Sequence, residues 1–395
     1  MSNNTSTTQT WLPFALAGLA ASLVGIGLAR FAYTPLLPTL IEAGWFAEIT
    51  AIYLGAANLA GYLAGALGGK WLATHFAPHR LLRFMMLLAV VSFFACMQPV
   101  SFVWFFVWRF LAGVSGGVLM VMAAATVLPH VPASKRGLAG GIIFTGVGLG
   151  IALSGTLVPA LIHIGVMETW AGLGIISLIL SLAAWRYWPM TDGPAQTPPT
   201  THARRSAFSP AFSSLYVVYA LAAVGMVAHM VFLVDYAARE LKLGIAVGSG
   251  YWVIFGIGAA LGPLAAGKIA DRIGFRATLR IFLFVQSLAV ALTVAGSSHL
   301  TLSLSSFLVG ALVPGIVPLI VGRAHQMSGT DAALQRSAWS YATVGFSVGQ
   351  AGAAYAFSYI YEITGHYDVL FQISAAAIAL AFVIDMLTPA PKEQT

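Results

Sequence analysis

The chain has 395 residues, of which 59% are hydrophobic and only 8% are charged. Soluble domains carry about 25% charged residues, so this composition excludes an ordinary soluble enzyme and indicates a polytopic membrane protein. In a soluble protein the formal net charge of +7 would suggest nucleic acid as a partner. In a membrane protein it follows from basic residues gathering on one side of the bilayer, and we expect no nucleic-acid partner.

The sequence lacks the residue patterns that hold a metal, a nucleotide or another cofactor. It contains one cysteine, Cys96, and no Walker loop, HExxH motif or cysteine pair. We therefore predict no metal, no cofactor and no hydrolysis of ATP.

Long apolar runs follow Met1 to Thr10, a polar and uncharged stretch without the basic region of a cleavable signal peptide. The first run is therefore expected to be a retained helix. A membrane helix needs about 20 apolar residues. The runs predict twelve membrane helices, at about 12–40, 48–70, 81–99, 102–128, 137–162, 167–188, 212–237, 247–270, 277–296, 299–322, 334–361 and 365–388.

Lysine and arginine set the predicted orientation. With the amino terminus inside, fifteen of the 19 basic residues fall on the inner side, whereas the outer loops hold only Arg239 and Lys242. The positive-inside rule then places both termini in the cytoplasm. We expect a multi-pass protein of a bacterial inner membrane.

The chain divides near its middle. A stretch rich in Pro, Thr and Ser predicts a flexible cytoplasmic linker between two sets of six helices. Paired features such as Leu82-Arg83 and Leu279-Arg280 recur in the same order about 200 residues apart, which indicates duplication of a six-helix unit. The predicted parts are the cytoplasmic tails 1–11 and 389–395, the bundles 12–188 and 212–388, and the linker 189–211.

A charged stretch between the eighth and ninth predicted helices is the most specific motif. It reads Gly267-Lys-Ile-Ala-Asp271-Arg272-Ile-Gly274-Phe275-Arg276. Ionised groups cost several kcal/mol at the bilayer centre, so we expect a short, tight loop at the membrane surface, with Gly267 and Gly274 suited to close helix approach and a sharp turn.

This stretch resembles the loop signature G-x-x-x-D-R-x-G-R-[RK] of the major facilitator superfamily. Gly267, Asp271, Arg272 and Gly274 match in register, and Phe275 stands where the family usually has Arg, with Arg276 after it. The resemblance implies a cytoplasmic gating loop that helps control the switch between inward-open and outward-open states. The alternative is a generic basic loop that obeys the positive-inside rule.

Three further patterns bear on the same resemblance. The first helix carries Arg30-Phe-Ala-Tyr33-Thr-Pro-Leu-Leu-Pro38, which resembles the R-F-x-Y-T-P-x-L-P stretch of the YbfB/YjiJ branch. The fourth helix carries Arg109 and Gly113, similar to the R-x-x-x-G pattern of that helix in the superfamily. The fifth helix is rich in glycine, which suits close packing, but it lacks the Gly-Pro pair of proton antiporters.

Arg30 is the strongest candidate for contact with a solute, because apolar sequence on both sides places it deep in the membrane. Tyr33 shares its helix face, so the two side chains can hold a carboxylate as a guanidinium fork and a hydroxyl donor. The alternative is a structural arginine that donates to backbone carbonyls. Arg109 reaches a similar depth and is predicted either to contact substrate or to join helices.

Three more polar residues lie at membrane depth. His229 and Asp235 of the seventh helix are candidates for proton coupling, because a histidine or a buried carboxyl group can exchange protons near neutral pH. His229 is also a candidate substrate contact, and Asp235 alternatively marks the outer end of its helix, before Arg239. Gln350 of the eleventh helix can bind substrate or join helices.

The resemblance implies a fold of twelve helices in two pseudo-symmetric six-helix bundles that rock around a central site. We predict a secondary active transporter, not an enzyme, that acts as a monomer in the lipid bilayer on a small-molecule substrate. Arg30 and Arg109 favour an organic anion, with proton symport as the coupling. The alternatives are proton-coupled efflux of drugs or metabolites and a membrane sensor that transports nothing.

Overall fold

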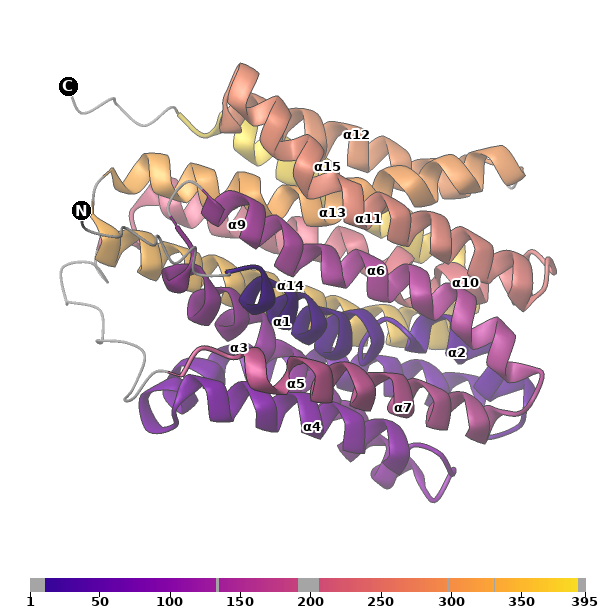
Figure 1. Cartoon of the computed structure of the whole chain (residues 1–395). Helices are drawn as coiled ribbons and strands as arrows, with labels where there is room; N and C mark the ends of the chain where they lie inside the picture. Colours follow the sequence, from indigo (N-terminus) through magenta and orange to yellow (C-terminus); the bar gives the residue numbers. More distant parts are fainter. Residues whose placement is uncertain (1–10, 133–134, 191–205, 297, 330, 390–395) are drawn as a thin grey trace.

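The computed structural model describes residues 11–132, 135–190, 206–296, 298–329 and 331–389, and within these ranges the chain forms helices and no strands (Figure 1). The predicted linker 189–211 and the two tails fall largely outside the described residues. The helices are α1 Leu12–Ser22, α2 Tyr33–Glu42, α3 Glu48–His75, α4 Pro78–Ala95, α5 Phe102–Val127, α6 Arg136–Ile162, α7 Val166–Ala184, α9 Pro210–Val227, α10 Leu233–Asp235, α11 Ile245–Ile273, α12 Phe275–Ala295, α13 His299–Ser328, α14 Ala332–Thr364 and α15 Tyr367–Leu387.

The prediction of an all-α polytopic membrane protein is confirmed. Eleven helical segments of the described chain are long and apolar enough to cross a membrane, including Leu12–Glu42, which contains α1 and α2, and Pro210–Glu240, which contains α9 and α10. The remaining long helix, α14, has 33 residues and lies over the predicted segment 334–361. The observed segments follow the twelve predicted ones in order.

The prediction of a loop at 267–276 is wrong for most of this stretch. Residues 267–273 continue α11 to Ile273, and only Gly274 separates α11 from α12. The φ angle of Gly274 is 85°, a conformation that glycine adopts at little energetic cost. The helix therefore ends at the residue that allows the chain to turn. Lys268 and Arg272 are good helix formers, and the helix continues through them past the apolar run. A Cβ atom on Gly267 would meet nothing within 4 Å, so this glycine serves no close helix contact here.

The helices form two bundles with the same internal arrangement (Figure 1). In the first, α3 packs on α5, α4 packs on α5 and α7, and α1 packs on α6. In the second, α11 packs on α13, α12 packs on α13 and α15, and α9 packs on α14. The bundles meet through α6 against α11 and through α3 against α14. Each contact in one half has its counterpart in the other, which confirms the predicted pseudo-symmetry.

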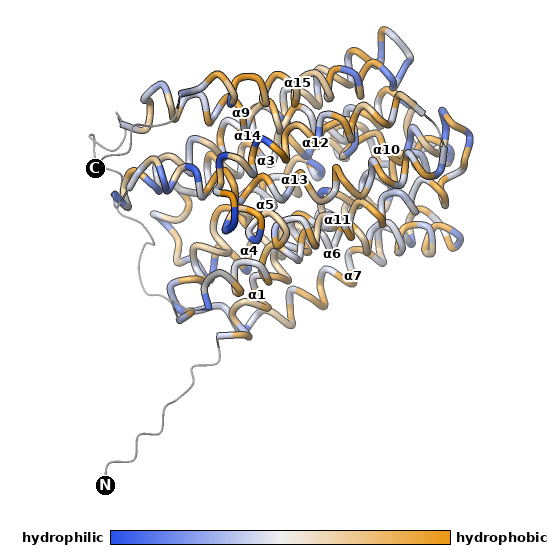
Figure 2. Tube along the Cα trace, turned by 90° about the horizontal axis from the view of Figure 1, so that it is seen from above, coloured by the Kyte–Doolittle hydropathy of each residue, from blue (hydrophilic) through white to orange (hydrophobic). Residues whose placement is uncertain are grey.

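The sides of the bundles are apolar, whereas hydrophilic residues gather mainly at the helix ends, with a few inside (Figure 2). On α7 and α11 the exposed hydrophobic residues recur three or four positions apart, as on one face of a helix. They include Ile175, Ile179, Leu182, Ile257, Leu261 and Leu264. A face of this kind suits lipid, and the buried interior between the bundles is left for the polar residues.

A close crossing of α3 and α5 sets the geometry of the middle of the first bundle. A Cβ atom on Gly113 would lie 1.9 Å from the carbonyl oxygen of Asn58, so a side chain there is excluded. Small residues let helix backbones approach in this way inside membranes. The crossing brings Asn58 of α3 beside the turn of α5 that carries Arg109.

Candidate functional site

The first membrane segment is interrupted at the height of Arg30. It forms a π-helical stretch at Leu23–Leu28 and a turn at 29–32 before α2 begins. Pro35 accounts for part of the interruption, because it has no N–H to donate and its ring clashes with the Phe31 carbonyl. The Thr34 N–H bonds that carbonyl instead, at 3.2 Å. The segment is therefore distorted at this point, with Arg30 buried in the turn and its backbone N–H still donating to the Ile26 carbonyl at 3.3 Å.

Arg30 crosses from the first bundle to the second. Its Nη2 donates to Oε1 of Gln350 on α14 at 2.6 Å and to Sδ of Met230 at 2.7 Å. The guanidinium also lies 4.9 Å from the ring centroid of Phe31 and 5.0 Å from that of Tyr62. Only 8% of Arg30 is exposed, and its Nε has no described hydrogen-bond partner. Neutral acceptors and aromatic faces thus hold the charge in place.

Arg109 of α5 also contacts the turn at 29–32. Its Nη1 donates to the Ala29 carbonyl at 2.9 Å, and its guanidinium lies 4.3 Å from the ring centroid of Tyr33. Asn58 Nδ2 donates to the Arg109 carbonyl at 3.1 Å. The Tyr33 hydroxyl donates to the Ala51 carbonyl at 2.6 Å, so it is already engaged in this state. Arg109 therefore joins helices, as the structural alternative expects, while it remains beside Arg30.

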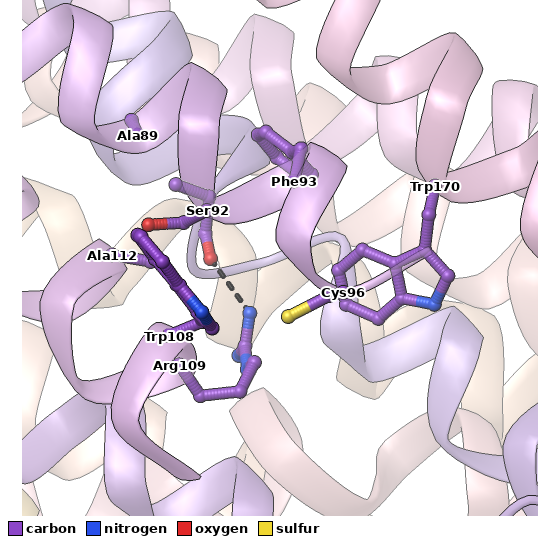
Figure 3. Close-up of a pocket in the computed structure, with 9 residues that line it drawn as sticks. Ala89, Ser92, Phe93, Cys96, Trp108, Arg109, Ala112 and Trp170 are labelled. Atoms are coloured by element: carbon purple, nitrogen blue, oxygen red, sulfur yellow. Dashed lines mark hydrogen bonds between the residues drawn. The ribbon is translucent and has the colours of Figure 1, made fainter. Parts of the chain in front are cut away.

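Two small cavities meet at Arg109. One, of about 20 Å³, lies between the bundles, and its lining includes Arg30, Tyr33, Thr34, Asn58, Arg109 and Met230. The other, of about 10 Å³, lies within the first bundle beside Ser92, Cys96 and Trp170 (Figure 3). Each is about the size that one water molecule needs. The inter-bundle cavity, which we call the central site, is closed around its arginines in this state.

Buried charge is paired elsewhere but not in the central site. Asp385 pairs with Arg280 and Arg323, at 2.8 and 2.9 Å. Asp235 pairs with Arg239 at 2.8 Å. Within the described chain Arg30 and Arg109 form no ion pair, although they are 8% and 3% exposed. Two desolvated cations without a counter-charge are costly, which makes the central site attractive to an anion.

His229 lies outside the central site. It belongs to a π-helical stretch, Ala228–Phe232, that points neighbouring residues to opposite sides: Met230 toward Arg30 and His229 into the second bundle. The His229 Nε2 lies 2.9 Å from Ser305 Oγ, and Ser305 donates its own hydrogen to the Ala289 carbonyl at 2.6 Å. Nε2 is therefore the donor, and Nδ1 is left as an acceptor without a described partner.

Asp235 belongs to a network that ties the bundles together near one end. Arg239 pairs both with Asp235 and with Glu48 at the start of α3. Tyr361 of α14 donates to Glu48, and Tyr367 of α15 donates to Asp235. Only Glu48 belongs to the first bundle, so this network closes the interface at the end formed by the connections 43–47 and 241–244. We call it the Glu48 clasp.

The polar contacts between the bundles are unevenly distributed along the helices. The described contacts between the bundles begin near the middle of the helices, where Arg30 bonds Gln350 and Trp252 bonds Ser154. They continue to the end of the molecule that carries the Glu48 clasp. Tyr53 also donates to Glu362 there, at 2.9 Å. Among the described residues no such bond joins the bundles at the opposite end, where α1 begins and α15 ends (Figure 1). This state is therefore closed by polar contacts at the clasp end.

Of the predicted site residues, Arg30, Tyr33 and Arg109 line the central site, and Gln350 contacts it through Arg30. His229 and Asp235 lie elsewhere in the second bundle, and the gating stretch lies at the end opposite the clasp, where Asp271 and Arg272 are exposed. Sequence reasoning missed Met230, because an apolar residue in an apolar helix gives no signal. It also missed Glu48, whose role depends on partners distant in the chain.

Comparison with known proteins agrees with this architecture. A family described as "Uncharacterised MFS-type transporter YbfB" matches residues 22–386. The inner membrane metabolite transport protein YdjE of Escherichia coli (strain K12) is 24% identical over 119 residues, which cover 30% of this chain and 26% of YdjE. The chain thus matches about a quarter of that relative's length.

Among solved structures, a point mutant of the nucleoside transporter NupG superposes with a TM-score of 0.75 at 14% sequence identity. The superposition covers 94% of this chain and 99% of NupG. At this level of identity the likeness establishes the fold alone. With the family match across nearly the whole chain, two six-helix bundles and a polar site between them, the protein belongs to the YbfB-type family of major facilitator transporters.

Proposed function

We propose that the protein carries a small organic anion, such as a carboxylate, across the bacterial inner membrane by alternating access. The observation that supports this most is the pair of buried guanidinium groups, Arg30 and Arg109, which line the central site and have no acidic partner in the described chain. A carboxylate can accept charge-assisted hydrogen bonds from such groups and neutralise them. Gln350 from the other bundle completes the site.

The bundles 12–188 and 212–388 rock around this site in the proposed cycle. The positive-inside rule supports a cytoplasmic location for both termini, because the end where α1 begins carries Arg80, Arg83, Lys268, Arg272 and Arg276. The Glu48 clasp then closes the external side, and this state faces the cytoplasm. The turn at Gly274 and the charged end of α11 lie on the cytoplasmic side and take part in the switch, with the protein acting as a monomer.

Proton symport is the proposed coupling, with His229 and Asp235 as its two candidate groups. Asp235 is held by Arg239 and Tyr367, so its negative charge is compensated in the clasp. The His229 ring contacts Ser305, Thr293 and Phe371, none of which carries a charge, and its Nδ1 is free to accept a proton. Thr293 also links this ring to Tyr236, whose hydroxyl donates to the Thr293 carbonyl at 3.3 Å.

Purified protein in detergent allows a direct test. We would measure the thermal midpoint with acetate, lactate, succinate, citrate, benzoate, neutral sugars, amino acids and lipophilic cations, at two pH values. Binding to the native state raises the midpoint by mass action. We expect one or more carboxylates to raise it for the wild type and for Arg186→Gln, an exposed-arginine control, but not for Arg30→Ala or Arg109→Ala.

Uptake into proteoliposomes would then show transport and its dependence on a pH gradient. Uptake of the stabilising carboxylate should fall at least about tenfold in Arg30→Ala, because a charge-assisted contact is worth about 1.5–3 kcal/mol. Stabilisation by lipophilic cations alone, unchanged in Arg30→Ala, would contradict the proposal and favour the efflux alternative. Binding without transport would favour a sensor.

A further inference from the structure

The hydrogen-bond acceptors of Arg30 are placed as the acceptor atoms of a bound ligand would be. Gln350 Oε1 and Met230 Sδ both accept from the same nitrogen, Nη2, at 2.6 and 2.7 Å. Both come from the second bundle, whereas Arg30 comes from the first. Gln350 is fully buried and Met230 is 2% exposed. One nitrogen of the guanidinium, Nη2, therefore donates to two neutral groups that approach from the side where a substrate between the bundles would lie.

The same side chains also keep unused donors. Gln350 offers its carbonyl oxygen to Arg30, but its Nε2 has no described hydrogen-bond partner. Nε of Arg30 has none either. Buried donors of this kind are uncommon in folded proteins, since each unmade bond carries a desolvation cost. Both donors are complementary to an anionic oxygen, which can accept several hydrogen bonds.

We propose that Gln350, assisted by Met230, is an internal stand-in for the anionic oxygen of the substrate. In the empty carrier its carbonyl oxygen occupies the place beside Arg30 that a carboxylate oxygen takes on binding. An ionised acceptor binds a guanidinium about twice as strongly as a neutral one, and a thioether is weaker still, so the substrate displaces both. The Gln350 side chain then turns its NH₂ group toward the bound anion.

This inference rests on the proposed anion transport and adds a role for one residue in it. The direct bond between bundles, from Arg30 to Gln350, is replaced by a bridge in which the anion accepts from both. Arg30 and Gln350 therefore connect the two bundles in both states, directly in the empty carrier and through the anion in the loaded one. An anion that is too small to reach Gln350 while it is bound to Arg30 loses this bridge, which makes Gln350 a specificity residue.

The substitution Gln350→Glu tests this idea, because it makes the stand-in a permanent carboxylate. Without any added ligand we expect its thermal midpoint to rise above that of the wild type by about 3 °C or more. We expect this rise to vanish in Arg30→Ala/Gln350→Glu, which completes a double-mutant cycle. We also expect succinate and benzoate to bind Gln350→Glu at least about 100-fold more weakly than the wild type, because their place is taken.

Gln286→Glu is the matched control. Gln286 is another fully buried glutamine, on α12, and its side chain has no hydrogen-bond partner in the described structure. We expect this variant to be destabilised without an Arg30-dependent gain. Gln350→Met, which removes the amide but keeps the size, should lower the midpoint and weaken anion binding about tenfold.

The outcomes separate this inference from the proposed function. A fall in the midpoint of Gln350→Glu that is equal with and without Arg30 would overturn the stand-in role. So would wild-type affinity for carboxylates in Gln350→Glu. Failure of every carboxylate to stabilise the wild type would overturn anion transport itself, whereas an Arg30-dependent gain in Gln350→Glu would still support a site at Arg30 that accepts a carboxylate.

Discussion

Replacing Glu48 with glutamine should shift the carrier toward a state that is open at the clasp end. Glu48 is the residue of the first bundle that accepts from both Arg239 and Tyr361 of the second. The Glu48 and Arg239 side chains are 38% and 21% exposed, so their ion pair contributes about 0.2–1 kcal/mol. The partly buried bond from Tyr361 adds a similar amount. We take the total as about 1.4 kcal/mol, which is tenfold in the equilibrium between states.

Distances between spin labels would measure this shift. In a Cys96→Ser background, one label pair at Ala43→Cys and Lys242→Cys spans the clasp end, and a second pair at Arg80→Cys and Ala277→Cys spans the opposite end. All four labelled positions are exposed. In Glu48→Gln we expect the first pair to gain a longer distance and the second a shorter one, because opening one end closes the other in alternating access.

Glu42→Gln provides the control, since Glu42 is exposed near the same end and forms no ion pair in the described chain. Its two distance distributions should match those of the wild type. Unchanged distributions in Glu48→Gln would refute the reasoning, because they would mean that the clasp contributes nothing to the balance between states. A change at the clasp end alone would refute the rocking motion that couples the two ends.

Three other substitutions follow from the described contacts. His229→Gln should abolish uptake driven by a pH gradient in proteoliposomes while exchange of substrate across the membrane persists, and His163→Gln, which is exposed, should alter neither. Gly113→Ala, whose Cβ would lie 1.9 Å from the Asn58 carbonyl oxygen, should lower the thermal midpoint by about 5 °C, whereas Gly68→Ala, with nothing within 4 Å, should not. Asp385→Asn should destabilise the second bundle by about 3 kcal/mol, measured by denaturant unfolding, because it leaves Arg323 buried without its carboxylate.

The membrane helices were predictable because apolar length is a local property of the chain. The twelve predicted segments were found in order, since each must satisfy its own backbone inside the bilayer. The error at 267–273 has a local cause as well. Charge marks the membrane surface, but a helix does not end at that surface when its residues favour helix, and α11 stops only at Gly274.

The central site was predictable only in part. The depth of Arg30 and Arg109 could be read from their apolar flanks, because a charge inside a membrane segment is rare. Their partners could not be read in this way, since Met230 and Gln350 lie 200 and 320 positions from Arg30. Helical periodicity predicts which residues share a face of one helix, but contacts between bundles depend on how the helices are arranged in space. The π-helical stretch at Leu23–Leu28 and the turn at 29–32 add to the difficulty, because they depart from the regular α-helical period.

The placement of buried charge also discriminates between the proposed cargo and a cationic one. A cation about 6 Å from a guanidinium group meets about 3 kcal/mol of repulsion at an effective dielectric constant of about 20, and an anion gains as much. With Arg30 and Arg109 together the difference between the two cargoes reaches about 11 kcal/mol before desolvation. Neither Asp235 nor Asp385 can offset this, because each is committed to arginines of the second bundle. A cation would need a carboxylate that the described central site lacks, whereas an anion supplies the counter-charge that both arginines lack.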